Sequence, residues 1–276
     1  MERADIDGLT LEYEDRGSGE PILLMHAGLC ADWFKPLVDE PALERRRLIR
    51  YHRVGYAGSG RVPGAVSLAD QARHCRELLR HVGVERAHLV GHSSSADIAM
   101  QVALDEPGMV ASLALLEPAL IPVPSRAAWG RTVAAPAVER FRSGDHAGAV
   151  DAWLQGVAGE DYASAMNRAL PAAFGQAVAD APTFFEQELP AVLEWAFDEE
   201  IARRITQPAL AVLGGRSHEV SPVWEERQAL LLSWLPAAEP FVLDGATHLL
   251  HLQNPCAMAD ALAAFYARHP LTASTA

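Results

Sequence analysis

The sequence predicts a doubly wound α/β fold built on a mostly parallel sheet. Short apolar runs alternate with longer stretches of helical spacing, and most of these runs have no polar residues at alternate positions. Strands of a parallel sheet are covered on both faces, so they read as continuous apolar runs. The chain has 276 residues, of which 50% are hydrophobic and 21% charged. That composition suits a large buried core.

The elements of this fold can be assigned in chain order. Six apolar runs are predicted as strands: 21–25 (PILLM), 48–51 (LIRY), 87–90 (AHLV), 112–116 (SLALL), 209–213 (ALAVL) and 239–243 (EPFVL). Helical spacing predicts helices over 68–82, 94–104, 222–235 and 254–269. This order of strand and helix is typical of a doubly wound sheet. Residues 9–14 are expected to add an antiparallel edge strand, and the tail 271–276 to be frayed.

The alternation of strand and helix breaks between residues 120 and 205. Pro122, Pro124 and Pro136 open this stretch, and the residues after them are alanine-rich, with helical spacing and no strand-like run. We therefore expect a helical cap at 120–205, inserted after the strand that ends at Leu116. The core then consists of 1–119 and 206–276. The aromatic residues of the cap either form its own core or face a substrate cleft beneath a lid.

Composition excludes several classes of function. The chain carries 23 basic and 36 acidic side chains, a formal net charge of −13. An acidic surface repels phosphate backbones and anionic lipid, so neither nucleic acid nor a membrane is an expected partner. The acidic N-terminus has no apolar run of signal-peptide length, and no apolar run could span a bilayer, which favours a cytoplasmic location. The expected partner is a small-molecule substrate, and the oligomeric state stays open.

Cofactor and metal chemistry also lack sequence support. The three cysteines, Cys30, Cys75 and Cys256, form no CxxC pair and no zinc-like cluster with histidines. The glycine-rich motifs of dinucleotide and nucleoside triphosphate binding are absent from the sequence. Lys35 is the only lysine, which leaves little scope for Schiff-base chemistry. We therefore expect no cofactor and no metal ion.

A serine in a strand-to-helix turn is the first candidate for chemistry. Gly91 and Ser95 flank Ser93 two residues before and two after, between the strand 87–90 and the helix 94–104. A nucleophile elbow needs small residues at these two positions, because its turn is sharp. The amide of Ser94, at the start of the helix, is free to point at an oxyanion. The alternative is that Ser93 only caps the helix.

Two further loops follow strands. Gly28, after the strand 21–25, lets the backbone approach a ligand, and its amide is a candidate second oxyanion donor. His248 lies in a loop after the strand 239–243, where a histidine is free to act as a general base. His251 is its rival, three residues nearer the last helix.

Together these motifs resemble the α/β-hydrolase superfamily over nearly the whole chain. The segment 51–59 (YHRVGYAGS) is also similar to a loop of that family, with His52 in place of an aspartate. The resemblance implies a catalytic triad in the chain order nucleophile, acid, histidine, which Ser93 and His248 obey. It also implies an oxyanion hole made by the amides of Gly28 and Ser94.

The triad acid departs from the family pattern. The family's usual aspartate position, just after the strand 209–213, is occupied by Ser217. Glu219 follows two residues later, and Glu117 ends the strand 112–116, where Pro118 is expected to hold it extended. Some superfamily members, including lactonases resembling the fungal zearalenone hydrolases, use a glutamate at the latter place. Glu117 is the preferred acid, and Glu219 or a triad without an acid are the alternatives.

The resemblance implies a serine hydrolase that cleaves an ester or lactone of a small, moderately apolar molecule through an acyl-enzyme. A serine at the elbow argues against epoxide hydrolase and dehalogenase chemistry, which need a carboxylate nucleophile. Two alternatives stay open. One is carbon–carbon bond hydrolysis, which the same superfamily performs, and the other is a ligand-binding member with an impaired triad.

Overall fold

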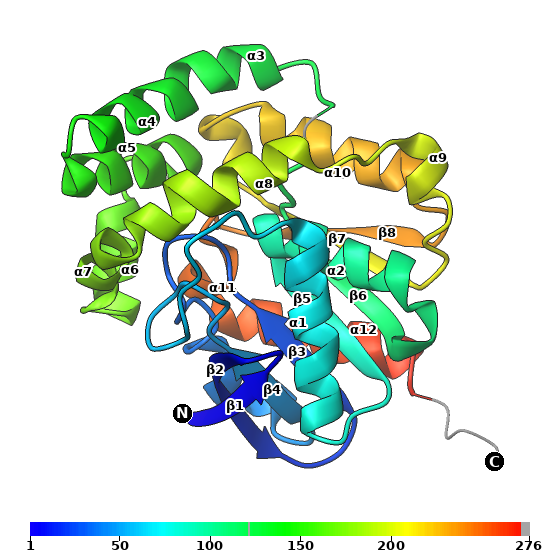
Figure 1. The fold of residues 1–276 in the computed structure, drawn as a ribbon. Helices are drawn as coiled ribbons and strands as arrows, with labels where there is room; N and C mark the ends of the chain where they lie inside the picture. The colour runs from blue at the N-terminus through cyan, green and yellow to red at the C-terminus, as the bar shows by residue number, and fades with distance from the viewer. Residues whose placement is uncertain (121, 272–276) are drawn as a thin grey trace.

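The computed structural model describes residues 1–120 and 122–271, and these form an eight-stranded sheet with helices on both faces (Figure 1). The strand order is β1-β2-β4-β3-β5-β6-β7-β8. The β1–β2 and β2–β4 pairs are antiparallel and all other pairs are parallel. The strands are β1 (Glu2–Ile6), β2 (Leu9–Gly17), β3 (Pro21–Met25), β4 (Arg47–Tyr51), β5 (Ala87–His92), β6 (Val110–Leu116), β7 (Ala209–Gly214) and β8 (Ala238–Leu243). The doubly wound, mostly parallel sheet is confirmed.

The edge of the sheet differs from the prediction. Residues 9–14 lie in an antiparallel strand, β2, as expected, but β2 is not the edge, because β1 pairs along it from Glu2 to Ile6. β1 carries only two buried side chains, Ala4 and Ile6, at alternate positions. Such a short alternating pattern is a weak strand signal.

Helices cover both faces because successive residues of the central strands point to opposite sides. On β3, Leu23 packs in the same cluster as residues of α1 (Leu68–His81) and α2 (Ser94–Asp105). Its neighbour Leu24 packs with α12 (Pro255–Arg268) on the other face. Figure 1 shows α1 and α2 in front of the sheet and α12 behind it.

The segment between β6 and β7 consists of helices joined by turns and loops, with no strand among its described residues. It contains α3 (Arg126–Trp129), η4 (Gly130–Ala134), α4 (Ala135–Arg142), α5 (His146–Ala158), α6 (Tyr162–Ala169), α7 (Ala173–Ala179), η5 (Thr183–Glu188), α8 (Leu189–Glu194) and α9 (Glu199–Ala202). Its buried residues share a cluster with Leu29, after β3, and Leu249, after β8. The cap therefore rests on the carboxyl ends of the parallel strands, where open α/β sheets place their sites.

The remaining α-helices, α10 (Val223–Trp234) and α11 (Leu250–Gln253), flank the loops after β7 and β8.

Within the described ranges, none of the helices is both long enough and apolar enough to cross a membrane. Two parts of the sequence-based prediction lie outside the described residues: residue 121 of the predicted cap, and residues 272–276 of the tail that we expect to be frayed.

Candidate active site

Ser93 occupies a sharp turn between β5 and α2. Its backbone has φ 55° and ψ −125°, a conformation that residues other than glycine rarely adopt. The Ser93 amide donates to the Leu116 carbonyl at 2.9 Å, which fixes the turn against β6. A Cβ atom on Gly91 would overlap the backbone of Ser95, so the turn requires glycine there. Ser93 lies where the sequence predicted it, and it borders a cavity under the cap.

Glu117 and His248 form a buried hydrogen-bonded pair. Glu117 Oε2 lies 2.7 Å from His248 Nδ1, and Glu117 Oε1 accepts from the Gly214 amide at 2.8 Å. The side chains of Glu117 and His248 are 1% and 6% exposed, respectively. Because the carboxylate accepts at Nδ1, the imidazole is held with Nε2 free to accept a proton.

The backbone of Glu117 is not extended, so the expectation drawn from Pro118 is wrong. Glu117 has φ 42°, in the left-handed region. Its amide still donates to the Val212 carbonyl of β7 at 3.1 Å, so the chain turns immediately after the β6–β7 ladder ends. The Glu117 carboxylate therefore contacts His248 from a turn, and not from an extended strand end.

The rival residues lie elsewhere. Glu219 pairs with Arg216 at 2.8 Å on the surface, and its side chain is 47% exposed. His251 is fully buried and stacks on Phe34 with ring centroids 4.2 Å apart. Ser217 is also fully buried, and a Cβ atom on Gly214 would lie 2.5 Å from its hydroxyl oxygen. Of the triad acids that the sequence leaves open, the geometry therefore favours Glu117.

The two candidate oxyanion residues face the same cavity. Gly28 and Ser94 both line it, together with Ser93 and His248. A Cβ atom on Gly28 would overlap the ring of Phe184 and lie 2.9 Å from Glu188 Oε1. Glycine at position 28 thus allows the cap to close directly over this loop.

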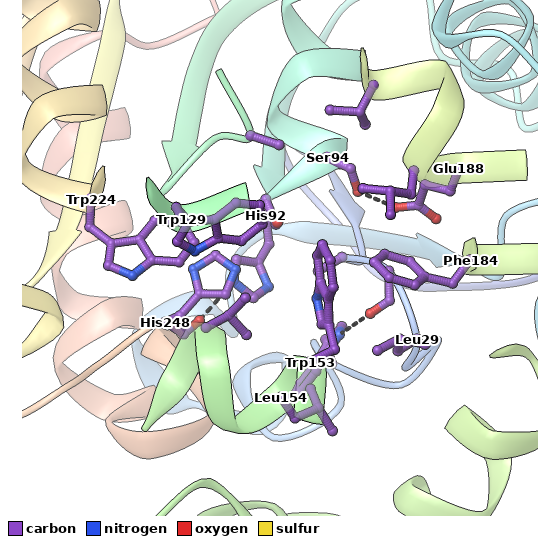
Figure 2. A pocket seen from close by; sticks show the side chains of 18 of the residues that line it. Leu29, His92, Ser94, Trp129, Trp153, Leu154, Phe184, Glu188, Trp224 and His248 are labelled. Atoms are coloured by element: carbon purple, nitrogen blue, oxygen red, sulfur yellow. Dashed lines mark hydrogen bonds between the residues drawn. The ribbon is translucent and has the colours of Figure 1, made fainter. Parts of the chain in front are cut away.

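The cavity is small and mostly apolar. It has a volume of about 80 Å³, and its walls include Trp129, Trp153, Phe184 and Trp224. Figure 2 shows Trp129, Trp224 and His248 gathered on one side and Ser94 with Glu188 on the other. The cap aromatics take both of the positions that the sequence left open. Phe184 lines the cavity, while Phe185 packs in the core of the cap. Among residues 1–120 and 122–271, no group of three His, Cys, Asp or Glu side chains is placed to hold a metal ion.

Four contacts around the site had no clear signal in the sequence. His92 Nε2 donates to the His248 carbonyl at 2.8 Å and so fixes the loop that carries His248. Glu188 of η5 forms a buried ion pair with Arg53 at 2.8 Å. The hydroxyls of Tyr56 and Ser94 also donate to Glu188. Glu188 is one of several glutamates in the cap, and its local sequence gives no hint of these partners, since they come from distant segments.

Burial sets the protonation of the pair. It raises the pKa of Glu117 to about 7 and lowers the pKa of His248, which the nearby charge of Arg227 lowers further. His248 is therefore neutral at neutral pH and can take a proton from a hydroxyl. In the described residues no hydrogen bond joins the Ser93 hydroxyl to His248, an arrangement common in unliganded active sites.

Comparison with known proteins supports the fold. A model of the family described as alpha/beta hydrolase fold matches residues 21–255. RutD of Azorhizobium caulinodans, whose carbamate hydrolase name is provisional, is 37% identical over 107 residues. That match covers 38% of this chain and only 40% of RutD, so the chain spans less than half of this curated relative.

Two solved structures share the fold over nearly the full length. A thermophilic esterase from Thermogutta terrifontis has a TM-score of 0.82 and 20% identity, covering 98% of this chain and 100% of its own. An enzyme described as degrading N-acyl homoserine lactones has a TM-score of 0.76 and 22% identity, covering 96% of this chain and 100% of its own. At these identities the likeness shows the fold alone.

Proposed function

Since the chain belongs to the α/β-hydrolase fold family, we propose that it is a serine hydrolase acting on a carboxylic ester or lactone. The observation that carries this proposal is the 2.7 Å contact of Glu117 Oε2 with His248 Nδ1, at the wall of the cavity that Ser93 borders. This pair supplies the acid and base that a serine nucleophile needs, although the usual acid position holds Ser217.

The proposed reaction proceeds through an acyl-enzyme. His248 Nε2 takes the hydroxyl proton of Ser93 as the serine oxygen bonds to the carbonyl carbon. The amides of Gly28 and Ser94 receive the developing oxyanion. His248 then passes the proton to the leaving oxygen as the ester bond breaks. In the second half, His248 removes a proton from water, and the water oxygen bonds to the acyl carbon. His248 then gives this proton to the Ser93 oxygen as the acyl bond breaks, which releases the acid and restores the serine hydroxyl.

Glu117 acts through His248 in both halves of the reaction. Its carboxylate fixes the imidazole orientation and stabilises the positive charge that forms when His248 is protonated. The Gly214 amide at 2.8 Å holds the second oxygen of this carboxylate. Tight burial keeps the pair free of competing water.

The cavity supports a small and moderately apolar substrate. Its walls are mainly tryptophan, phenylalanine and aliphatic side chains, and its volume is about 80 Å³. Such a lining binds hydrocarbon surface, and offers few partners for a sugar or a phosphate.

A substrate panel tests the proposal. Short-chain esters, lactones of similar size and a vinylogous diketone would be offered to the wild type and to Ser93→Ala. We expect turnover of esters or lactones by the wild type and a loss of more than about 10³-fold in Ser93→Ala. Cleavage of the diketone with no ester turnover would replace the proposal with carbon–carbon hydrolysis. Binding without turnover of any compound would favour the impaired, ligand-binding alternative.

A further inference from the structure

Arg227 is a buried arginine that forms no ion pair with a carboxylate in the part of the chain that the structure describes. It projects from α10 to the wall of the cavity and is 6% exposed. Its Nε–H donates to the Leu120 carbonyl at 2.9 Å, and no carboxylate of the described residues lies within 4.0 Å of it. A guanidinium has five N–H donors, so most of them are left for another partner.

Two indole rings hold this guanidinium in place. Arg227 Cζ lies 5.0 Å from the ring centroid of Trp224 and 5.6 Å from that of Trp129. Trp224 in turn stacks on His248, with centroids 4.1 Å apart and ring planes 18° from parallel. Trp129, Trp224 and His248 are seen together on one side of the pocket in Figure 2. The positive charge therefore lies one indole ring away from the proposed general base.

Neither Glu188 nor Glu117, the two glutamates nearest the cavity, forms an ion pair with Arg227. Glu188 is paired with Arg53, and Glu117 is bound to His248 and the Gly214 amide. Each of these carboxylates therefore already has its own partners.

Three other charged groups lie near Arg227. Asp97 of α2 is fully buried, and neither of its carboxyl oxygens forms a hydrogen bond with Arg227. Burial raises the pKa of Asp97, and the charge of Arg227 lowers it. Glu226, the neighbour of Arg227 on α10, accepts from the amide and the hydroxyl of Ser125 at 2.9 and 2.6 Å. Arg126, on the cavity wall, adds a second positive charge.

Arg227 itself stays charged. Burial lowers its pKa to about 10, which is still far above neutral pH. A buried cation without a paired anion is unfavourable, and an anionic ligand would offset that cost. Arg126 and Arg227 both line the cavity, although the chain as a whole has a formal net charge of −13. Two positive charges there favour an anionic ligand.

We propose that Arg227 binds a carboxylate of the substrate, so that the substrate is an ester or lactone that carries an acid group. This inference rests on the proposed function and narrows its substrate class. A planar carboxylate matches the planar fork of the arginine, which can bind both carboxylate oxygens through two parallel N–H···O hydrogen bonds. The rest of the substrate is apolar, in keeping with the cavity walls.

A matched pair of substrates tests the inference. The 4-nitrophenyl monoester of glutaric acid and 4-nitrophenyl valerate have acyl chains of equal length, and differ in a carboxylate against a methyl group. We expect the wild type to have the higher kcat/KM on the glutarate ester, by about 10-fold or more. Arg227→Met should lower the ratio of the two kcat/KM values by about 10- to 100-fold, chiefly through KM.

The ratio of the two kcat/KM values separates recognition of the substrate carboxylate from effects on the triad. Arg227 also lies close enough to lower the pKa of Glu117, so its loss can slow both substrates together. Such a common change cancels in the ratio. Arg216→Met is the matched control, because Arg216 pairs with Glu219 on the surface, away from the cavity. We expect it to leave the ratio unchanged.

The outcomes separate this inference from the proposed function. An unchanged ratio in Arg227→Met, or a wild type that turns over valerate as well as glutarate, would overturn the inference alone. Hydrolysis of neither ester, or hydrolysis that persists in Ser93→Ala, would overturn the proposed function. If Arg227→Met fails to fold, the wild-type preference decides, together with inhibition by free glutarate but not by the neutral amide of valeric acid.

Discussion

Glu117 has the position of a triad acid although it comes from the strand before the usual one. Its carboxylate lies 2.7 Å from His248 Nδ1, while Glu219 lies on the surface in contact with Arg216. We expect Glu117→Gln to lower kcat by about 10⁴-fold, as loss of the acid does in other serine triads. Glu219→Gln is the control and should stay near the wild-type rate. The assignment is wrong if Glu219→Gln is inactive while Glu117→Gln keeps its activity.

The protonation of Glu117 predicts how kcat/KM falls as the pH is lowered. Burial raises the pKa of Glu117 to about 7, so below that pH the carboxyl is neutral and cannot stabilise the protonated imidazole. Burial lowers the pKa of His248, so the histidine stays neutral across the same range. The value of kcat/KM on a neutral ester should therefore rise with pH through about 7 and level off above it.

The same measurement on Glu117→Gln identifies the group. The variant has no carboxyl at this position, so its residual activity should lose the limb near pH 7. If the limb persists there, it belongs to His248 or to another group, and the explanation by burial of Glu117 fails.

Among single residues, the sequence predicted the site residues that belong to local motifs. It did not predict those whose contacts come from distant segments of the chain. Ser93, Gly28 and His248 each follow a recognisable strand, so their positions could be predicted. Glu117 could be proposed only because Ser217 replaces the usual acid, and the turn that carries it was not foreseen. Arg227 and Glu188 contact residues that are distant in the sequence, and no local pattern encodes these contacts.

At the scale of elements, the elbow depends on a close approach of two backbones. A Cβ atom on Gly91 would overlap the carbonyl group of Ser95 and the Cα of Ala96, neither of which can move aside without moving α2. We expect Gly91→Ala to destabilise the fold by about 1–3 kcal/mol or more and to abolish ester hydrolysis. Urea unfolding and an activity assay measure the two effects.

Gly108→Ala is the control for this effect. Gly108 is exposed in a short turn, and a Cβ atom there would meet no other atom within 4 Å. Its free energy of unfolding should stay within about 0.5 kcal/mol of the wild type. Equal effects of the two substitutions would show that the close approach at the elbow is not the reason for glycine at position 91.

Element boundaries were predictable where burial is strong. β3 begins and ends at the predicted residues, and α1 and α2 differ from the prediction by one residue at their ends. These elements have continuous buried faces and clear starts, such as the Ser67–Asp70 capping box of α1. β1 escaped notice because it has one covered face and only two buried side chains.

At the scale of the whole molecule, the cap is joined to the core by a buried ion pair. Glu188 of the cap is bound by Arg53 of the core at 2.8 Å, and both side chains are at least nine-tenths buried. Removing one partner leaves the other charged and buried, which costs about 3–5 kcal/mol. We expect Glu188→Gln to lower the free energy of unfolding by that order, as measured in urea.

Glu186 offers a control within the same helical segment. It is exposed on η5, so Glu186→Gln should change the free energy of unfolding by no more than about 0.5 kcal/mol. Similar effects of the two substitutions would mean that the ion pair with Arg53 does not anchor the cap.

The central claim is that Glu117 and His248 activate Ser93, and covalent labelling tests it most directly. Wild type, Ser93→Ala, Glu117→Gln and Glu219→Gln would be treated with a fluorophosphonate, and the intact proteins weighed over time. We predict one adduct on the wild type and on Glu219→Gln, slow labelling of Glu117→Gln, and none on Ser93→Ala. A folded wild type that gains no adduct, or a Ser93→Ala variant that gains one, would contradict the account.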